Sequence, residues 1–168
     1  MKNLTGHYFC GGAILNNKWI ITVKQCIEVN DDIIIQAGSR FLESEESESN
    51  IQSIKVKRKV VLDNKYSAPA LLELEKPLKF NPLTQNIDIS SFKNAAEDKD
   101  VVITSGWGPN VLNHFGQSNI LRVANKTAND CGYAKTFCVI EGDGNACIVS
   151  TFYKLCLLYA YKKILLNF

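Results

Sequence analysis

Short apolar runs, rich in β-branched residues and bounded by polar or turn-prone residues, recur along most of the chain. We expect each run to form a β-strand, because apolar stretches of this length fit a buried or half-buried strand. The expected strands cover residues 19–23, 33–36, 55–62, 71–74 and 101–105. No segment before the C-terminal region has the length and period of an ordinary helix. The pattern therefore predicts an all-β fold, either a sandwich or a barrel.

Three segments depart from this pattern. Residues 81–100 are mostly polar and predict a connection between two halves. The acidic run 43–48 predicts a solvated loop, because it lacks the regular spacing of oxygen ligands that a calcium site requires. Residues 148–168 contain no Gly or Pro and are rich in Leu, Tyr and Lys, so they form either one amphipathic helix or a tail without selected structure. The apolar part of this tail, residues 155–166, is too short to span a bilayer.

The overall composition is that of an ordinary soluble globular protein, with 46% hydrophobic residues. The chain has 168 residues, enough for one domain or two very small ones. Its 19 basic and 17 acidic residues give a net charge of +2. Such a balance produces no strong field, so we expect neither nucleic acid nor a membrane as a partner.

The cysteines point to an oxidising compartment. There are six, in no C-x-x-C pair, and only two histidines, so a structural zinc site is not expected and disulfides are. The glycosylation sequons at Asn3 and Asn125 agree with secretion. No apolar signal segment precedes the first cysteine, so either the chain is cytosolic or its beginning is missing. We expect a secreted protein.

One segment carries a specific family resemblance. Residues 7–26 read HYFCGGAILNNKWIITVKQC. This closely resembles the chymotrypsin-like serine proteases, whose members read F-C-G-G-S-L-I and then W-V-L-T-A-A-H-C. Further matches follow in the family's order at residues 36–39, 68–78, 104–108, 137–138 and 142–147. The resemblance extends over most of the chain, from about residue 7 to residue 147.

The resemblance implies one trypsin-like domain over residues 1–168, folded as a double six-stranded β-barrel. The first barrel would cover about 7–80, without its N-terminal strand. A connection would cover about 81–100. A truncated second barrel would cover about 101–147, followed by the atypical tail 148–168. No cofactor or metal is implied.

The catalytic positions of the family are substituted in this chain. The family uses a serine nucleophile, a histidine base and an aspartate that orients the histidine. The resemblance places Gln25 at the histidine, Ala68 at the aspartate and Thr151 at the serine. A glutamine amide has no pKa near 7 and cannot carry the proton. The resemblance also places Asn145, which is uncharged, at the base of the specificity pocket.

The resemblance also implies two disulfides. Cys10 and Cys26 have the family's spacing and would close a loop across the first barrel, with two buried free thiols as the alternative. Cys131 and Cys138 resemble the next pair of the family, with a shorter loop. Cys147 and Cys156 either pair with each other or leave Cys156 as a stray thiol.

Three functions are consistent with these residues. The first is a secreted, monomeric homologue without catalysis, which binds protein partners such as host defence proteins or protease inhibitors. Such a protein resembles the inactive protease paralogues of parasitic mites. The second is a serine-type endopeptidase represented by an incomplete or misread gene model, since the tail begins where G-D-S-G-G-P is expected. The third is a fragment without function.

Overall fold

The computed structural model describes residues 1–28, 30–43, 50–62, 68–88, 101–107, 118–130 and 137–141. For residues 102–104, 124–130 and 137–141 the description covers the backbone alone. The chain divides into two compact units, Met1–Ile89 and Ser90–Phe168, which are described separately.

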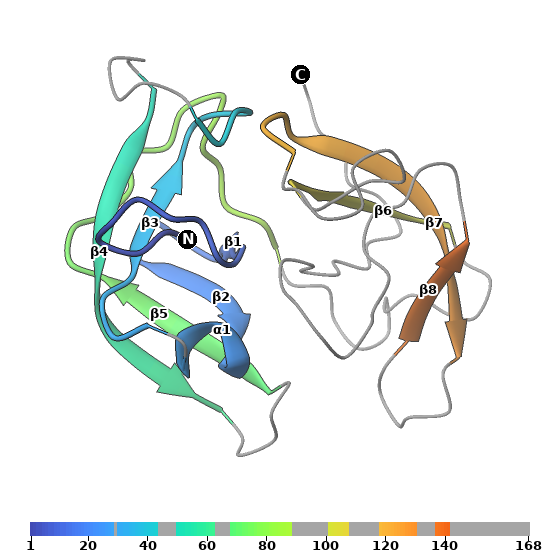
Figure 1. Ribbon diagram of the computed structural model, residues 1–168, viewed down its shortest axis with the longest axis horizontal. Helices are drawn as coiled ribbons and strands as arrows, with labels where there is room; N and C mark the ends of the chain where they lie inside the picture. The colour runs from blue at the N-terminus through green and yellow to red at the C-terminus, as the bar shows by residue number, and fades with distance from the viewer. Residues whose placement is uncertain are drawn as a thin grey trace. The chain divides into compact units, whose positions relative to one another are not determined.

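The first unit is built on a curled antiparallel sheet (Figure 1). The strand order is β1-β2-β5-β4-β3. One short helix, α1, directly follows β2 in the chain. The elements are β1 (Ala13–Ile14), β2 (Trp19–Val23), α1 (Lys24–Glu28), β3 (Ile34–Ala37), β4 (Gln52–Val61) and β5 (Pro69–Leu74).

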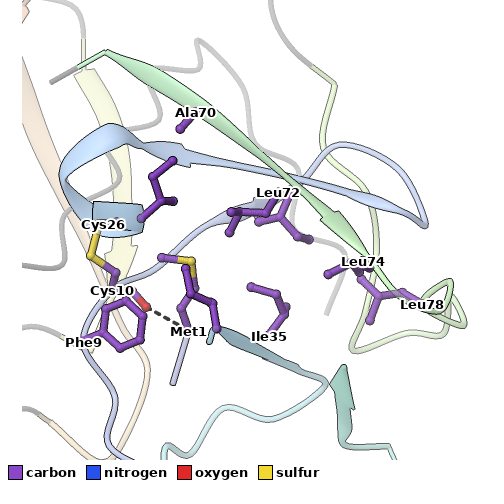
Figure 2. Packing of buried hydrophobic residues seen from close by; sticks show 12 residues of the cluster. Met1, Phe9, Cys10, Cys26, Ile35, Ala70, Leu72, Leu74 and Leu78 are labelled. Carbon is purple, nitrogen blue, oxygen red and sulfur yellow. Dashed lines mark hydrogen bonds between the residues drawn. A yellow bond between two sulfur atoms is a disulfide. The ribbon is translucent and has the colours of Figure 1, made fainter. Parts of the chain in front are cut away.

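The core of this unit lies on one face of β2 and β5. Side chains alternate across a strand, so Ile20 and Thr22 on β2 are buried together with Leu72 and Leu74 on β5. The buried side chains of the two strands lie on the same face because Ile20 pairs directly with Leu72. Figure 2 shows Leu72 and Leu74 of β5 together with Met1 from the N-terminal segment and Leu78 from beyond β5. The cluster comprises Met1, Phe9, Cys10, Ile20, Cys26, Ile27, Ile33, Ile35, Ala70, Leu72, Leu74 and Leu78.

The second unit contains a three-stranded antiparallel sheet in the order β6-β7-β8. Its strands are β6 (Val101–Gly106), β7 (Arg122–Asp130) and β8 (Phe137–Glu141). The central strand β7 pairs along β6 from Thr127 opposite Val101 to Arg122 opposite Gly106. The predicted limits of the two barrels and of their connection stay predictions, and the tail 148–168 lies outside the described residues.

All five predicted strands are present. Residues 19–23 form β2 with the predicted bounds, and residues 101–105 form β6 with one residue more. The run 33–36 is shifted by one residue, to Ile34–Ala37. The other two strands begin earlier than predicted, at Gln52 and Pro69. No described helix is long and apolar enough to cross a membrane.

Candidate functional site

The structure brings Gln25 and Ala68 to the same end of two neighbouring strands. The β2–β5 ladder ends with Val23 opposite Pro69. One residue further, the backbone N–H of Lys24 donates a 2.8 Å hydrogen bond to the carbonyl of Ala68. Gln25 is the next residue of α1 and is half-buried, while Ala68 is buried. The positions that the resemblance assigns to the histidine and the aspartate are therefore adjacent.

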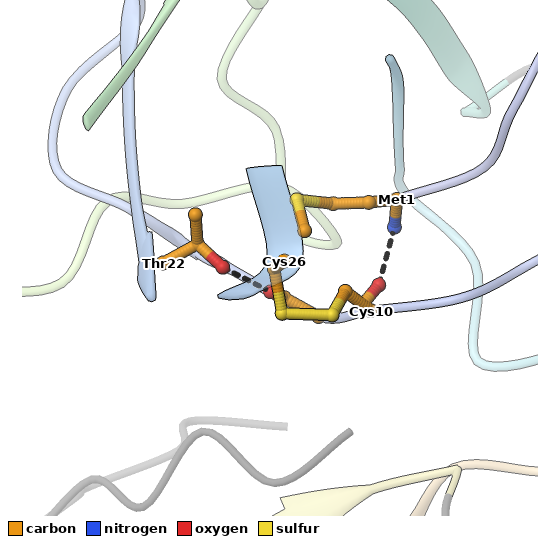
Figure 3. Close-up of a disulfide and its surroundings, with 5 residues drawn as sticks. Met1, Cys10, Thr22 and Cys26 are labelled. Atoms are coloured by element: carbon orange, nitrogen blue, oxygen red, sulfur yellow. Dashed lines mark hydrogen bonds between the residues drawn. A yellow bond between two sulfur atoms is a disulfide. The ribbon is translucent and has the colours of Figure 1, made fainter. Parts of the chain in front are cut away.

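A disulfide fixes the helix that carries Gln25. Cys10 and Cys26 are bonded, with their Cα atoms 5.9 Å apart, and both are buried. Figure 3 shows the bridge between the Thr22 hydroxyl and Met1. Thr22 Oγ1 donates to the carbonyl of Gly11 at 2.9 Å, and the Met1 amino group donates to the carbonyl of Cys10 at 2.8 Å. Because Cys26 follows Gln25 directly, the bridge anchors the helix at the candidate site.

Lys59 supports the other end of the same helix. The last carbonyls of a helix have no partner within it, and a cation there also interacts favourably with the helix dipole. The Lys59 ammonium donates to the carbonyls of Ile27, at 3.0 Å, and Asn30. On the surface of the helix, Lys24 and Glu28 form an i,i+4 ion pair of 3.4 Å.

Neither Gln25 nor Ala68 has a side chain that can act as an acid or a base near neutral pH. The Gln25 amide donates and accepts hydrogen bonds but does not exchange a proton near neutral pH. Ala68 presents a methyl group, which can neither orient an imidazole nor stabilise its charge. Among the described residues, no group of three or more His, Cys, Asp or Glu side chains is placed to hold a metal ion.

The remaining predicted site residues are placed as follows. Thr151, Asn145 and Cys131, together with Cys147, Cys156 and His114, lie outside the described residues. The backbone of Cys138 lies in β8 opposite Asn129, and that of Asn125 lies in β7 opposite Ile103. His7 is exposed, and its backbone N–H is bonded to the side chain of Asn3.

Asn3 lies at a tight exposed turn. Its side-chain oxygen accepts hydrogen bonds from the Thr5 hydroxyl at 2.7 Å, the Thr5 backbone N–H at 3.1 Å and the His7 backbone N–H at 2.9 Å. Gly6 closes the turn with a positive φ of 83°. Both polar side chains of the sequon therefore meet on the outside of the protein.

Sequence reasoning missed Lys59 as a support of the helix. In the sequence, only the alternation of side chains along a strand indicates which face of the sheet Lys59 occupies. β4 breaks this alternation, because its register with β5 shifts between Val56 and Arg58. That irregularity places Lys59 opposite the buried Leu72, so the lysine faces inward. Nothing in the local sequence marks the change.

Most of the chain matches known proteins in sequence. The trypsin family model matches residues 1–147. Coagulation factor IX of Oryctolagus cuniculus is 35% identical over 68% of this chain, and hypodermin-A of Hypoderma lineatum is 29% identical over 70%. The chain spans 44% and 46% of those two relatives, so less than half of either.

Solved structures agree on the fold. Human heparin binding protein superposes with a TM-score of 0.70 at 16% identity, over 82% of this chain and 63% of that one. A mutant of the same protein gives a TM-score of 0.68 at 17% identity, over 80% of this chain and 62% of that one. The prediction of an all-β, trypsin-like fold is confirmed. The chain belongs to the trypsin family.

Proposed function

We propose that this protein is a trypsin-family homologue without peptidase activity, which acts by binding other proteins. One observation supports the proposal: the backbone N–H of Lys24 is hydrogen-bonded to the carbonyl of Ala68, so the positions that the resemblance assigns to the histidine and the aspartate are neighbours. Neither Gln25 nor Ala68 can do the chemistry of those residues. The register between β2 and β5 supports this alignment independently of the sequence resemblance. In the sequence, the nearest acid upstream of Ala68 is Asp63, and its neighbours do not match the pattern of the family.

The expected catalytic deficit is large. Loss of a triad member leaves only the catalysis that binding and the oxyanion hole supply. In this chain the base and its orienting acid are both replaced. In the sequence, residues 148–152 also lack the glycines that flank the nucleophile in the family. Binding of protein partners, such as protease inhibitors or host defence proteins, needs the surface of the scaffold but not its proton transfer.

A peptidase assay tests the loss of catalysis. We expect no turnover of a broad panel of fluorogenic peptides above the buffer rate, and no labelling by a serine-directed fluorophosphonate, because no base activates a hydroxyl. The matched variants are Ser150→Ala and Thr151→Ala, which remove the two hydroxyls nearest the nucleophile position. A rate that the fluorophosphonate abolishes, or that either variant abolishes, would show an active peptidase.

A serine-type endopeptidase remains the second candidate, because the chain spans only 44% of the length of its factor IX relative. A longer chain would have room for a nucleophile segment that this one does not contain. Sequencing the transcript across Cys147 tests this candidate directly. A G-D-S-G-G-P segment there would favour an active enzyme, although Gln25 and Ala68 would still need explanation.

Secretion belongs to the proposal, and Asn3 offers a test of it. Support comes from the buried disulfide, typical of oxidising compartments, and from the exposed sequon turn. After passage through a eukaryotic secretory pathway, we expect a glycan on Asn3, seen as a mass that a glycan-removing amidase lowers.

The control for this prediction keeps or removes a single hydroxyl. Thr5→Ser retains the bond to the Asn3 side chain and should retain the glycan, whereas Thr5→Ala and Asn3→Gln should lose it. Peptide mapping assigns the mass to Asn3 rather than Asn125. An unmodified Asn3 in secreted protein would contradict the prediction.

A further inference from the structure

We propose that Asn125 carries an N-linked glycan and that this glycan covers an exposed apolar face of the β6–β7 sheet. Residues 125–127 read NKT, which is an acceptor sequon. The register of the two strands shows where such a glycan is attached and which surface lies beside it. The proposal rests on passage through the secretory pathway, which belongs to the proposed function.

The strand register places the sequon on one face of the sheet. Directly paired residues of an antiparallel ladder lie on the same face, and every second residue of a strand returns to that face. Three pairs of the β6–β7 ladder therefore share this surface, here called the sequon face: Val101 with Thr127, Ile103 with Asn125, and Ser105 with Val123. Asn125 belongs to the middle pair of the three.

The sequon face is exposed and has an apolar residue at each end. Val101 is 64% exposed and Val123 is 50% exposed, and Ser105, opposite Val123, is exposed as well. The three residues of this face whose side chains are described thus all reach solvent. Exposed apolar surface on a sheet promotes association with other molecules. A cover over this face would lower that tendency.

A glycan on Asn125 is well placed to be the cover. Val123 precedes Asn125 by two residues on β7, which is about 7 Å at the rise of a strand. Val101 lies diagonally across the ladder from Asn125, at about 7–8 Å. The attachment point therefore lies between the two exposed valines. Because a glycan is bulky and solubilising, it would replace the apolar surface with a hydrated one and keep another protein surface away.

The first test measures the occupancy of Asn125. The chain is directed through a eukaryotic secretory pathway by an added, cleavable signal peptide, and its peptides are mapped by mass spectrometry. We expect a glycan on Asn125 that Asn125→Gln and Thr127→Ala remove and that Thr127→Ser keeps. Asn3→Gln is the matched control and should leave it in place. An unmodified Asn125 would overturn the proposal, and a glycan on Asn3 of the same protein would then leave the proposed secretion standing.

The second test measures whether the glycan covers the sequon face. In the variant Asn3→Gln only the sequon at Asn125 remains. Removal of its glycan by an amidase should make this protein elute later from a hydrophobic-interaction column. Adding Val101→Thr/Val123→Thr should abolish the shift, because threonine keeps the strand propensity but removes the apolar surface. The amidase leaves an aspartate in both proteins, so its charge cancels in the comparison.

Two results of the second test would overturn the proposed cover: no shift in the parent protein, or a shift of the same size in the threonine variant. The competing cover is a second copy of the chain. A dimer of the glycosylated protein that the threonine substitutions dissociate would mean that a second copy occupies the face, and would also overturn the proposal. Thermal unfolding of each variant verifies that it is folded.

Discussion

Replacing Cys10 and Cys26 with alanine should lower the free energy of unfolding by about 3 kcal/mol. The bridge closes a loop with a sequence separation of 16, and cross-links of this size stabilise by about that amount in the chain-entropy estimate. Both cysteines also belong to the buried core, so their removal costs packing as well. Urea unfolding of the double variant, monitored by tryptophan fluorescence, measures the change.

The matched comparison is reduction of the wild type. Dithiothreitol should lower the unfolding midpoint of the wild type more than that of the double variant, in which only the four other cysteines can respond. Leu4→Ala, at an exposed position, controls for the loss of an apolar side chain without the bridge. A double variant with the stability of the wild type would show that the bridge does not hold the N-terminal segment to α1.

The stability of protein with a free Met1 amino group should rise as the pH increases from 5 to 8. Burial, followed by the charge of Lys2, lowers the pKa of this group from 8.0 to about 5. In that interval the folded amine is neutral while the unfolded amine is protonated, so the unfolded state binds more protons and is favoured at lower pH. The contribution of this group to the free energy of unfolding is fully present above pH 8 and is lost as the pH falls to 5.

The expected difference across this interval is about 4 kcal/mol, from three pH units at about 1.4 kcal/mol each. Urea unfolding at each pH measures it. Protein acetylated at its N-terminus is the control, because its amide does not titrate and its stability should lack this component. Identical pH profiles for the two forms would contradict burial of the neutral amine.

Strands in both sheets could be predicted from local pattern. The runs that became β2 and β6 are short, apolar and bounded by polar residues, so pairing and burial acted in the same direction as propensity.

Gly38 lies in one of the segments that carried the resemblance. Its φ is +94°, and a side chain there would collide with the carbonyl of Asn50. The need for glycine at that turn is therefore physical.

Other elements could not be predicted. β1 has two residues and α1 has five, which is too few for any periodicity to appear. β7 alternates poorly in its sequence, RVANKTAND, and its strand is defined by the ladders with β6 and β8 on either side. Pairing with neighbouring strands determines the conformation of β1 and β7, and the Cys10–Cys26 disulfide holds α1. Local preference does not.

The trypsin-like fold class and the assignment of Gln25 and Ala68 to catalytic positions could be read from the sequence, because they depend on motifs and on the chemistry of single side chains. The contact between those two positions, the inward direction of Lys59 and the outward direction of both Lys57 and Arg58 follow from the folded structure. These facts depend on register between strands distant in the chain, and a shift of one residue reverses the face that a side chain occupies.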